Sequence, residues 1–352
     1  MTLEELIAYA RQTGCSDIHL TQGRPTVLRR LGQLVNGELG DDAAQQQERI
    51  LSLLGERQRQ ALETGEDLDF SFACGSDRQR VNVYRHMGKL CAAIRLLAAD
   101  IPTLDELHLP PVMHRLAMLP RGLVLITGPT GSGKSTTLAA MIDAINRSRS
   151  CHILTIEDPI EYVYAPALSM IHQREVGQDV GSFAGALRSA LREDPDVILV
   201  GEMRDYETIS AAVTAAETGH LVLSTLHTPG AAQSVDRIID VFPSHSQGQI
   251  RIQLAGVLAG VITQQLLPRA DGSGRVAATE VLLGTDAVRS QIREGKTHQL
   301  SGAMQSGAET GMHTMEGDLA RLVRDQVISP QMAMERAANL AELQQYLPQL
   351  GF

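Results

Sequence analysis

The hydrophobic and polar positions at the start of the chain predict a short helix. Thr2 and Glu5 have the spacing of a capping box, in which each side chain meets the other residue's backbone N–H. The apolar residues that follow share one face of a helix that ends near Gly14; they are Leu3, Leu6, Ile7 and Ala10. We therefore expect ordered structure from the first residues onward.

Beyond this helix the pattern is mostly that of strands. Over residues 16–35, stretches in which apolar and polar residues alternate are separated by turn signals, which predicts a hairpin or meander. A Gln-, Glu- and Leu-rich stretch predicts helix over about 42–63, and renewed alternation predicts strands at 68–75 and 80–97. Together these elements predict an α+β domain over residues 1–98.

From residue 122 the pattern changes to short apolar runs separated by helical segments, which is typical of buried parallel strands. The runs fall at 123–127, 153–156, 197–200 and 221–223. Prolines break up residues 99–121, which favours an interdomain linker with one short helix between Pro111 and Pro120. We therefore expect a largely parallel α/β domain over 122–352, mostly helical in its last part, with Pro330 starting a helix.

Composition narrows the class of protein. A length of 352 residues suits two domains, and 43% hydrophobic with 20% charged residues is typical of a globular protein. No apolar run approaches the roughly 20 residues of a membrane helix, and the N-terminal residues do not resemble a signal peptide, so we expect a cytoplasmic protein without an integral membrane segment. The scattered cysteines predict reduced, mostly buried thiols; they are Cys15, Cys74, Cys91 and Cys151.

Charge and aromatic content argue against nucleic acid as a partner. The formal net charge is −10, there is no Trp, and aromatic residues make up 3% of the chain. A surface that follows a phosphate backbone needs excess Lys and Arg, and single-stranded nucleic acid is usually stacked on aromatic side chains. A DNA-translocating motor is therefore disfavoured.

The segment GPTGSGKSTT, residues 128–137, matches the phosphate-binding loop pattern G-x-x-x-x-G-K-[ST] between an apolar strand and a helical run. Its glycines let backbone N–H groups face phosphate oxygens, Lys134 would reach the β and γ phosphates, and Ser135 would bind Mg²⁺. The predicted ligands are ATP and Mg²⁺. The residues expected to bind ATP are Gly128, Pro129, Thr130, Gly131, Ser132, Gly133, Lys134, Ser135 and Thr136.

Acidic residues follow two of the predicted strands. Glu202 comes after the strand at 197–200, and Glu157, Asp158 and Glu161 follow or end the strand at 153–156. The carboxyl ends of parallel strands face the ligand crevice, so these carboxylates can orient a magnesium shell and polarise a water molecule. We assign Glu202 as the Walker-B-type acid and Glu157 to the Mg²⁺ shell; the alternative is that they are solvated loop carboxylates.

The third strand, HLVLSTLHT, carries polar groups at its end. Ser224, Thr225 and His227 lie where a γ phosphate could be sensed, whereas His220 begins the strand nearer the opposite edge. Gly219 supplies a left-handed residue after the preceding helix. Packing or capping is the alternative role for both histidines.

Four segments resemble the Walker A, Asp-box, Walker B and His-box motifs of secretion-superfamily ATPases: GPTGSGKSTT, TIEDPIEY, ALREDPDVILVGEMRD and AAETGHLVLSTLHT. The similarity runs from SDIHL to GMHTMEGDLARLV and is greatest to the type IV pilus retraction branch of that family. The resemblance implies a PAS-like N-terminal domain followed by a RecA-like P-loop ATPase domain. It also implies a homohexamer that hydrolyses ATP to power pilus retraction and twitching motility, peripheral at the inner membrane on a pilus platform protein.

The resemblance also implies roles for individual residues. Glu161 corresponds to the water-activating base, and Glu202 to the Walker B acid. His227 matches the His-box histidine and His220 a second one. Two arginines of the first domain, Arg80 and Arg95, correspond to arginines that approach the nucleotide; surface ion pairing is the alternative for each.

Two departures from the family bear on the function. The retraction signature AIRNLIRE reads AVRSQIRE here, at 287–294, which keeps Arg289, Arg293 and Glu294. Pilus assembly and type II secretion ATPases carry a tetracysteine zinc element that is missing here, which favours retraction over assembly or secretion. The alternatives that stay open are an assembly or secretion ATPase and a nucleotide-gated regulatory protein with little turnover.

Overall fold

The computed structural model describes the chain except for residues 31, 38–42, 76, 98–99 and 348–352. The chain divides into two compact units, Met1–Asp100 with Asp158–Val163, and Ile101–Glu157 with Tyr164–Phe352. The domain boundary that we predicted at residue 98 lies outside the described residues. Within the described part of the chain, no helix combines the length and apolar character needed to cross a membrane.

The first unit is an antiparallel sheet with helices. Its sheet has the strand order β3-β2-β1-β6-β5-β4, so that β1 and β6 lie at the centre. Along the chain its elements are α1 (Leu3–Gln12), β1 (Cys15–Thr21), β2 (Val27–Arg30), β3 (Gln33–Asn36), α2 (Ala43–Ser52), α3 (Glu56–Glu63), β4 (Leu68–Cys74), β5 (Asp77–His86) and β6 (Lys89–Leu96). The predicted strands are confirmed, with the first group forming a meander.

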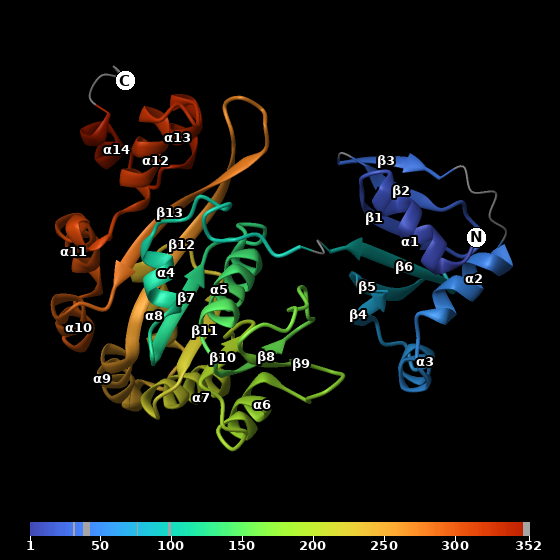
Figure 1. Ribbon diagram of the computed structural model, residues 1–352, viewed down its shortest axis with the longest axis horizontal. Helices are drawn as coiled ribbons and strands as arrows, with labels where there is room; N and C mark the ends of the chain where they lie inside the picture. Colours follow the sequence, from blue (N-terminus) through green and yellow to red (C-terminus); the bar gives the residue numbers. More distant parts are fainter. Residues whose placement is uncertain (31, 38–42, 76, 98–99, 348–352) are drawn as a thin grey trace. The chain divides into compact units, whose positions relative to one another are not determined.

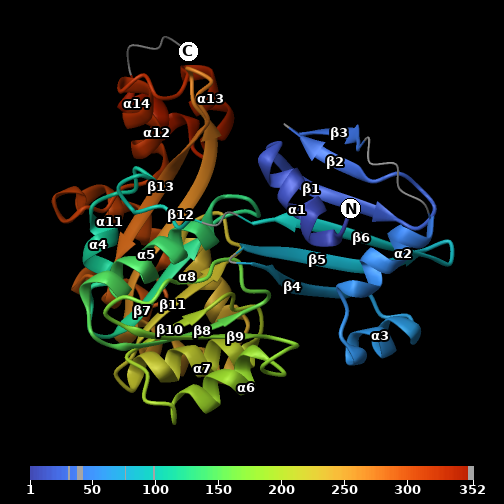
Figure 2. The ribbon, with the colours of Figure 1, turned by 45° about the vertical axis from the view of Figure 1, so that its right-hand side comes forward.

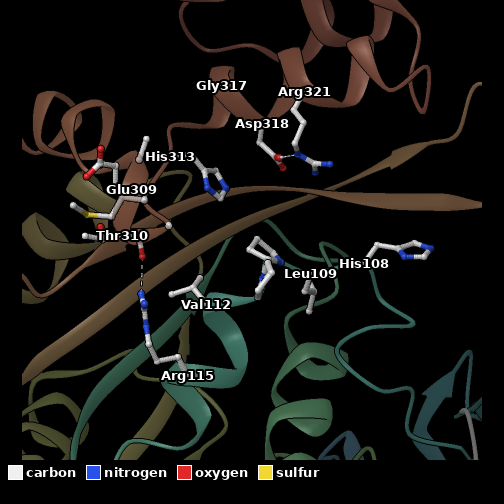
Figure 3. Close-up of a pocket in the computed structure, with 15 residues that line it drawn as sticks. His108, Leu109, Val112, Arg115, Glu309, Thr310, His313, Gly317, Asp318 and Arg321 are labelled. Carbon is white, nitrogen blue, oxygen red and sulfur yellow. Dashed lines mark hydrogen bonds and ion pairs between the residues drawn. The ribbon is translucent and has the colours of Figure 1, made fainter.

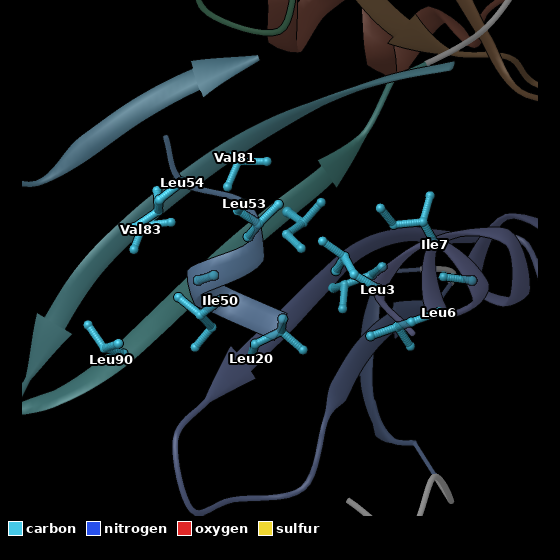
Figure 4. Close-up of a cluster of buried hydrophobic side chains, with 14 of the residues drawn as sticks. Leu3, Leu6, Ile7, Leu20, Ile50, Leu53, Leu54, Val81, Val83 and Leu90 are labelled. Atoms are coloured by element: carbon cyan, nitrogen blue, oxygen red, sulfur yellow. The ribbon is translucent and has the colours of Figure 1, made fainter. Parts of the chain in front are cut away.

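The capping box that begins α1 is confirmed. The backbone N–H of Glu5 donates to the Thr2 hydroxyl at 3.2 Å, and that of Thr2 donates to the Glu5 carboxylate at 2.8 Å. All four predicted apolar residues of α1 are buried, and Figure 4 shows Leu3, Leu6 and Ile7 gathered with side chains of α2 and the strands. This cluster is the core of the first unit.

The helical stretch predicted over about 42–63 forms two helices with a break between them, and its first residue lies outside the described part. Leu53 and Leu54 leave the helical path and are buried in the core, and Gly55 is the N-cap of α3. The Gln58 side chain accepts from the Gly55 N–H at 2.9 Å, which satisfies a donor at the new helix start. Burial of the two leucines therefore outweighs helix continuity.

The second unit is built on a mostly parallel sheet with the strand order β13-β12-β7-β11-β10-β8-β9. Its strands are β7 (Gly122–Thr127), β8 (His152–Glu157), β9 (Met170–Glu175), β10 (Val197–Val200), β11 (Leu221–Leu226), β12 (Leu258–Pro268) and β13 (Arg275–Leu283). Only β13 pairs antiparallel. The four predicted apolar strands are confirmed, while β9, β12 and β13 were not predicted.

Helices cover both faces of this sheet (Figures 1 and 2). The helices of this unit are α4 (Val112–Ala117), α5 (Lys134–Ser148), α6 (Phe183–Ala190), α7 (Tyr206–Glu217), α8 (Ala231–Asp240), α9 (Gln247–Val257), α10 (Asp286–Arg293), α11 (Leu300–Ser306), α12 (Met315–Arg324), α13 (Pro330–Arg336) and α14 (Leu340–Tyr346). The crossover through α5 moves along the sheet in one direction and those through α6 and α7 move in the other, which places them on opposite faces.

Three local predictions in this unit are confirmed. A short helix, α4, lies between Pro111 and Pro120; Pro330 is the first residue of α13; and Gly219 has φ +110° just after α7. The cysteine prediction is confirmed in part. All four cysteines are reduced, but only Cys15 and Cys91 are buried, whereas Cys74 and Cys151 are half-buried.

Strands β12 and β13 form a long ribbon that extends toward the C-terminal helices in both views (Figures 1 and 2). Apolar side chains from the ribbon and from α12, α13 and α14 form a separate buried cluster, which includes Leu267, Val276, Leu319 and Leu343. The sequence pattern did not predict these two strands, because Thr, Gln and Glu interrupt their apolar runs.

Candidate functional site

The loop after β7 has the backbone conformation of a phosphate cradle. Gly128, Gly131 and Gly133 have φ values of +135°, +79° and +91°, which L side chains rarely adopt. A Cβ atom on Gly128 would lie 2.3 Å from the backbone oxygen of Gln264, on the neighbouring strand β12. Glycine is therefore required at Gly128 both by its conformation and by the close approach of β12.

The side chain of Lys134 is bonded to the backbone of this loop. Its Nζ donates to the backbone oxygens of Gly128 and Pro129, each at 2.9 Å, and the residue is only 8% exposed. The ammonium group is thus held directly over the loop whose N–H groups would face a phosphate. Since Lys134 is the first residue of α5, the helix N-terminus adds a favourable field for an anion at the same place.

The hydroxyl groups of the loop fit a magnesium–triphosphate ligand. Ser135 is exposed in the first turn of α5, as a hydroxyl ligand of Mg²⁺ must be. Ser132 is buried, and its Oγ has no hydrogen-bond partner within the described residues. Such an orphaned donor inside the cradle suits a phosphate oxygen. Within the same residues there is no group of three or more His, Cys, Asp and Glu side chains that could hold a metal ion by itself.

Glu202 stands next to the loop at the end of β10, as predicted. Its carboxylate oxygens meet the Arg204 Nε at 2.7 Å and the His227 Nε2 at 3.5 Å, and its side chain is 17% exposed. Because β10 lies two strands from β7, with β11 between them, the carboxylate and the loop face the same crevice.

His227 connects Glu202 to the loop. Its Nδ1 lies 3.5 Å from the Thr130 hydroxyl, while its Nε2 faces Glu202. Burial, Lys134 and Arg204 together outweigh the carboxylate of Glu202 and lower the pKa of His227 below its usual value. The lowered pKa favours the neutral imidazole at pH 7, and the carboxylate facing Nε2 favours the tautomer with its hydrogen there, which leaves Nδ1 to accept from Thr130.

Ser224 and Thr225, expected to sense a γ phosphate, hold the backbone instead. Ser224 donates its hydroxyl to the Val200 oxygen at 2.8 Å, and Thr225 donates to the Gly201 oxygen at 2.6 Å. Both bonds tie β11 to the residues just before Glu202. Their effect is to fix the position from which the Glu202 side chain extends.

Glu157 ends β8 next to this site, but its carboxylate already has partners. One oxygen accepts from the Thr155 hydroxyl at 2.6 Å and from the Gln173 amide at 3.2 Å. In the parallel pairing of β8 and β10, Ile156 lies opposite Val200, so Glu157 comes at the level of Gly201. Its assignment to the Mg²⁺ shell stays a prediction.

His220 does not lie at the phosphate loop. It precedes the six-residue strand β11, whereas His227 follows it, so the two histidines lie at opposite ends of the strand, roughly 20 Å apart. The His220 Nδ1 faces the Ala215 oxygen at 2.8 Å and the Thr218 hydroxyl at 3.2 Å, at the end of α7. These contacts are those of a helix-capping residue, and its proposed nucleotide contact stays untested.

The remaining predicted residues belong to the first unit. Arg80 and Arg95 are opposite each other on β5 and β6, where Arg80 pairs with Asp69 and the Arg95 Nε pairs with Asp17 at 3.0 Å. Glu161 is in the segment Asp158–Val163, which also belongs to this unit. Hydrogen bonding to Asp69 is the main cause that raises the pKa of Arg80, and Glu161 contributes in the same direction.

Two residues beside the loop were missed by sequence reasoning. Arg204 had no assigned role, although its position two residues after Glu202 was a usable signal. Gln264 is on β12, which was not predicted; its side-chain amide donates to Thr137 at 3.0 Å while its backbone oxygen bounds Gly128. The buried Gln264 Oε1 has no hydrogen-bond partner in the described residues.

The second unit also contains a cavity of about 800 Å³ away from this loop, between the segment around α4 and the start of α12. Figure 3 shows Leu109 and Val112 on one side and His313 and Asp318 on the other. The His313 Nε2 lies 2.9 Å from the Thr279 hydroxyl, which in turn bonds to Asp318. Arg321 pairs with the same aspartate at 2.7 Å.

Comparisons with known proteins agree with this architecture. Residues 83–345 match the family described as type II/IV secretion system protein. The chain is 46% identical over 339 residues to the type IV pilus retractation ATPase PilT of Pseudomonas aeruginosa, which covers 96% of this chain and 98% of that protein. It is 51% identical over 291 residues to a twitching motility protein of Neisseria gonorrhoeae, covering 82% and 78% of the two chains.

The crystal structure of the pilus retraction motor PilT with bound ADP superposes on this chain with a TM-score of 0.92 at 46% identity, covering 98% of this chain and 99% of that one. These likenesses confirm the resemblance inferred from the four motifs. They also confirm the predicted fold class, an N-terminal domain followed by a RecA-like P-loop ATPase domain.

Proposed function

Because the chain belongs to the type II/IV secretion system protein family, whose members here include ATPases, we propose that it is a Mg²⁺-dependent ATPase that drives type IV pilus retraction. The observation that carries this proposal is the connected group Thr130–His227–Glu202 beside Lys134. This group joins the phosphate loop after β7 to the carboxylate of Glu202, which follows β10. The names of the related proteins, a retraction ATPase and a twitching motility protein, support the direction of the work.

Each residue of the group has a separate task. Lys134 exchanges its two backbone acceptors for oxygens of the β and γ phosphates, and the first N–H groups of α5 donate to the same phosphates. Ser135 and Glu202 would hold Mg²⁺, directly and through water. Mg²⁺, when bound, supplies positive charge that offsets the charge developing on the phosphates.

His227 acts as a neutral connector. Through Thr130 it is coupled to the loop, and through Nε2–H it orients the Glu202 carboxylate. Arg204 balances the same carboxylate at 2.7 Å. A change in the loop on nucleotide binding is therefore passed to Glu202 through two contacts, Thr130 to His227 and His227 to Glu202.

Glu161, Arg80 and Arg95 complete the proposal. Glu161 acts as the base that activates water, and the two arginines stabilise the phosphate charge that develops during transfer. Each arginine now pairs with an aspartate, so it has to exchange that partner for the nucleotide. We propose that this exchange accompanies closure of the two units in a homohexamer.

A mutation series tests ATP hydrolysis. Glu202→Gln removes the charge that pairs with Arg204 and faces His227, and we expect turnover to fall by about 10²–10⁴-fold with ATP binding retained. Glu161→Gln should behave alike. The matched control is Glu207→Gln, an exposed glutamate at the start of α7, which should keep normal phosphate release. Normal turnover in both Glu202→Gln and Glu161→Gln would refute the assignment.

Retraction itself needs a test in cells. We propose that the ring docks on an inner-membrane pilus platform protein from the cytoplasmic side. A deletion strain complemented with Lys134→Ala should assemble pili but fail to retract them, whereas the wild-type gene restores retraction. Normal retraction in the deletion strain would assign that role to another protein, and ATP binding without turnover in the purified protein would favour a nucleotide-gated regulator.

A further inference from the structure

A second cavity, of about 720 Å³, lies at the opposite end of the sheet from the phosphate loop. It is bounded by Gly122, where β7 begins, and by Ala259 near the start of β12. Since β7 runs six residues from Gly122 to the loop, the cavity is roughly 20 Å from the nucleotide site. The proposed ATPase chemistry makes no use of it.

Three arginines from separate elements line this cavity, which we call the arginine cavity: Arg115 of α4, Arg121 before β7, and Arg289 of α10. Arg115 donates to the Thr310 oxygen at 2.6 Å, and the Arg289 Nε donates to the Gly284 oxygen at 2.8 Å. Backbone oxygens thus hold two guanidinium groups in place without neutralising their charge.

The charge in the arginine cavity is poorly balanced. Within the described residues, none of the three arginines forms an ion pair, Arg115 and Arg289 bond only to backbone oxygens, and Arg121 makes no hydrogen bond. The only carboxylate among the residues that line the cavity is Glu217, which accepts from the Gln253 amide at 2.9 Å. In a chain of net charge −10, a local excess of positive charge around one cavity is unusual and suits an anionic ligand.

Apolar surface adjoins the arginines. Leu119 and Val257 are partly exposed in the wall, and Ile252 on the outer face of α9 is 63% exposed. Ile250 and Leu254 of the same helix are buried, so Ile252 lies on the face of α9 that points away from the core. A cavity with charged and apolar walls of this size is larger than a simple inorganic anion needs and is within the range of ligand sites.

We propose that the arginine cavity binds an acidic segment of a protein partner, with carboxylates on the arginines and a neighbouring apolar side chain against Ile252. Arg forks bind carboxylates in a bidentate way, and a flanking apolar contact adds affinity that a free anion cannot obtain. Arg289 comes from the AVRSQIRE segment, to which the nucleotide site gives no role. The partner surface is therefore distinct from the nucleotide site.

The test uses a labelled peptide in which Glu and Leu alternate. Its binding to the full-length protein is measured by fluorescence anisotropy. Arg121→Glu should weaken binding by at least about tenfold, because one favourable charge contact is replaced by a repulsive one. Ile252→Ser should weaken it too. The matched control is Arg293→Glu, an exposed arginine on α10 outside the cavity, which should leave binding unchanged.

Thermal unfolding of each variant checks that the fold is intact. Because the assay measures peptide binding, its result does not depend on ATP turnover. Raised salt should weaken binding of the wild type more than that of Arg121→Glu. Equal binding of a matched peptide with Gln in place of Glu, or no effect of Arg121→Glu, would overturn the proposal. So would inorganic phosphate that binds as tightly as the peptide and displaces it, since the cavity would then be a simple anion site.

Discussion

Gly128 is the residue at which the sequence pattern and the surrounding structure act together. The motif requires a glycine there, and the structure adds a second reason, because the Gln264 backbone occupies the space of a side chain. Gly131, three residues on, has a similar backbone requirement but open space around it. The two glycines therefore separate the effect of conformation from that of close approach.

Gly128→Ala should cost more than Gly131→Ala. The backbone conformation alone costs about 1–3 kcal/mol at either position, and only the change at Gly128 also forces β12 away from the loop. We expect Gly128→Ala to lower the unfolding midpoint and to abolish ATP binding measured by calorimetry. Equal midpoints for the two variants would show that β12 yields readily.

How far the site could be predicted also varies from residue to residue. The positions of Lys134 and Glu202 follow from the order of strand, loop and acid, which the sequence displays. The contact of Glu202 with His227 depends on the register of β10 against β11, which no local pattern specifies. For the same reason Ser224 and Thr225 were given a ligand, although their hydroxyls bind the neighbouring strand.

At the scale of elements, apolar strands were predicted and half-polar ones were not. The runs at β7, β8, β10 and β11 are almost entirely apolar because both faces are covered by helices. By contrast, β12 and β13 include Thr, Gln and Glu that bond to helices, as Glu280 does to the Ala231 N–H at 2.7 Å. Others of these residues, such as Gln264 and Thr279, interrupt the apolar pattern while remaining buried.

The junction of β13 with α12 predicts a pH dependence of stability. Burial is the main cause that lowers the pKa of His313 below its usual value, opposed by Asp318. The unfolded chain therefore binds a proton more readily, so stability is full above the unfolded pKa and falls as the pH drops toward the folded pKa. His313→Asn should lose less stability than the wild type between pH 7.5 and pH 5.5, measured by thermal unfolding.

The control for this prediction is His298→Asn, because His298 is exposed. It should follow the wild type at both pH values. If His313→Asn shows the same loss of stability as the wild type on acidification, then another titrating group carries the pH dependence.

At the scale of the whole molecule, each unit has a core of its own. The apolar cluster of the first unit is drawn entirely from residues between Leu3 and Leu96, so a fragment 1–100 contains all of it. The two domains were predicted from the change of hydrophobic period, but the assignment of Asp158–Val163 to the first unit could not be, because it depends on contacts far apart in the sequence.

We expect the fragment 1–100 to fold alone and to unfold in one cooperative transition. The fragment contains α1 and all six strands of the sheet, so it retains every strand pairing of the first unit. The chain has no Trp, so circular dichroism rather than tryptophan fluorescence is the suitable measurement during urea titration. A gradual, non-cooperative loss of signal would show that the second unit is needed for the core to form.

The β12–β13 ribbon joins two places that the sequence separates widely. At one point on β12 the Gln264 oxygen bounds Gly128, and along β13 the Thr279 N–H donates to Asp318 of α12 at 2.8 Å. Because β12 and β13 are paired along their length, the ribbon gives a continuous hydrogen-bonded connection from α12 to the strand beside the phosphate loop. A displacement of the C-terminal helices would therefore act on the same pair of strands that borders Gly128.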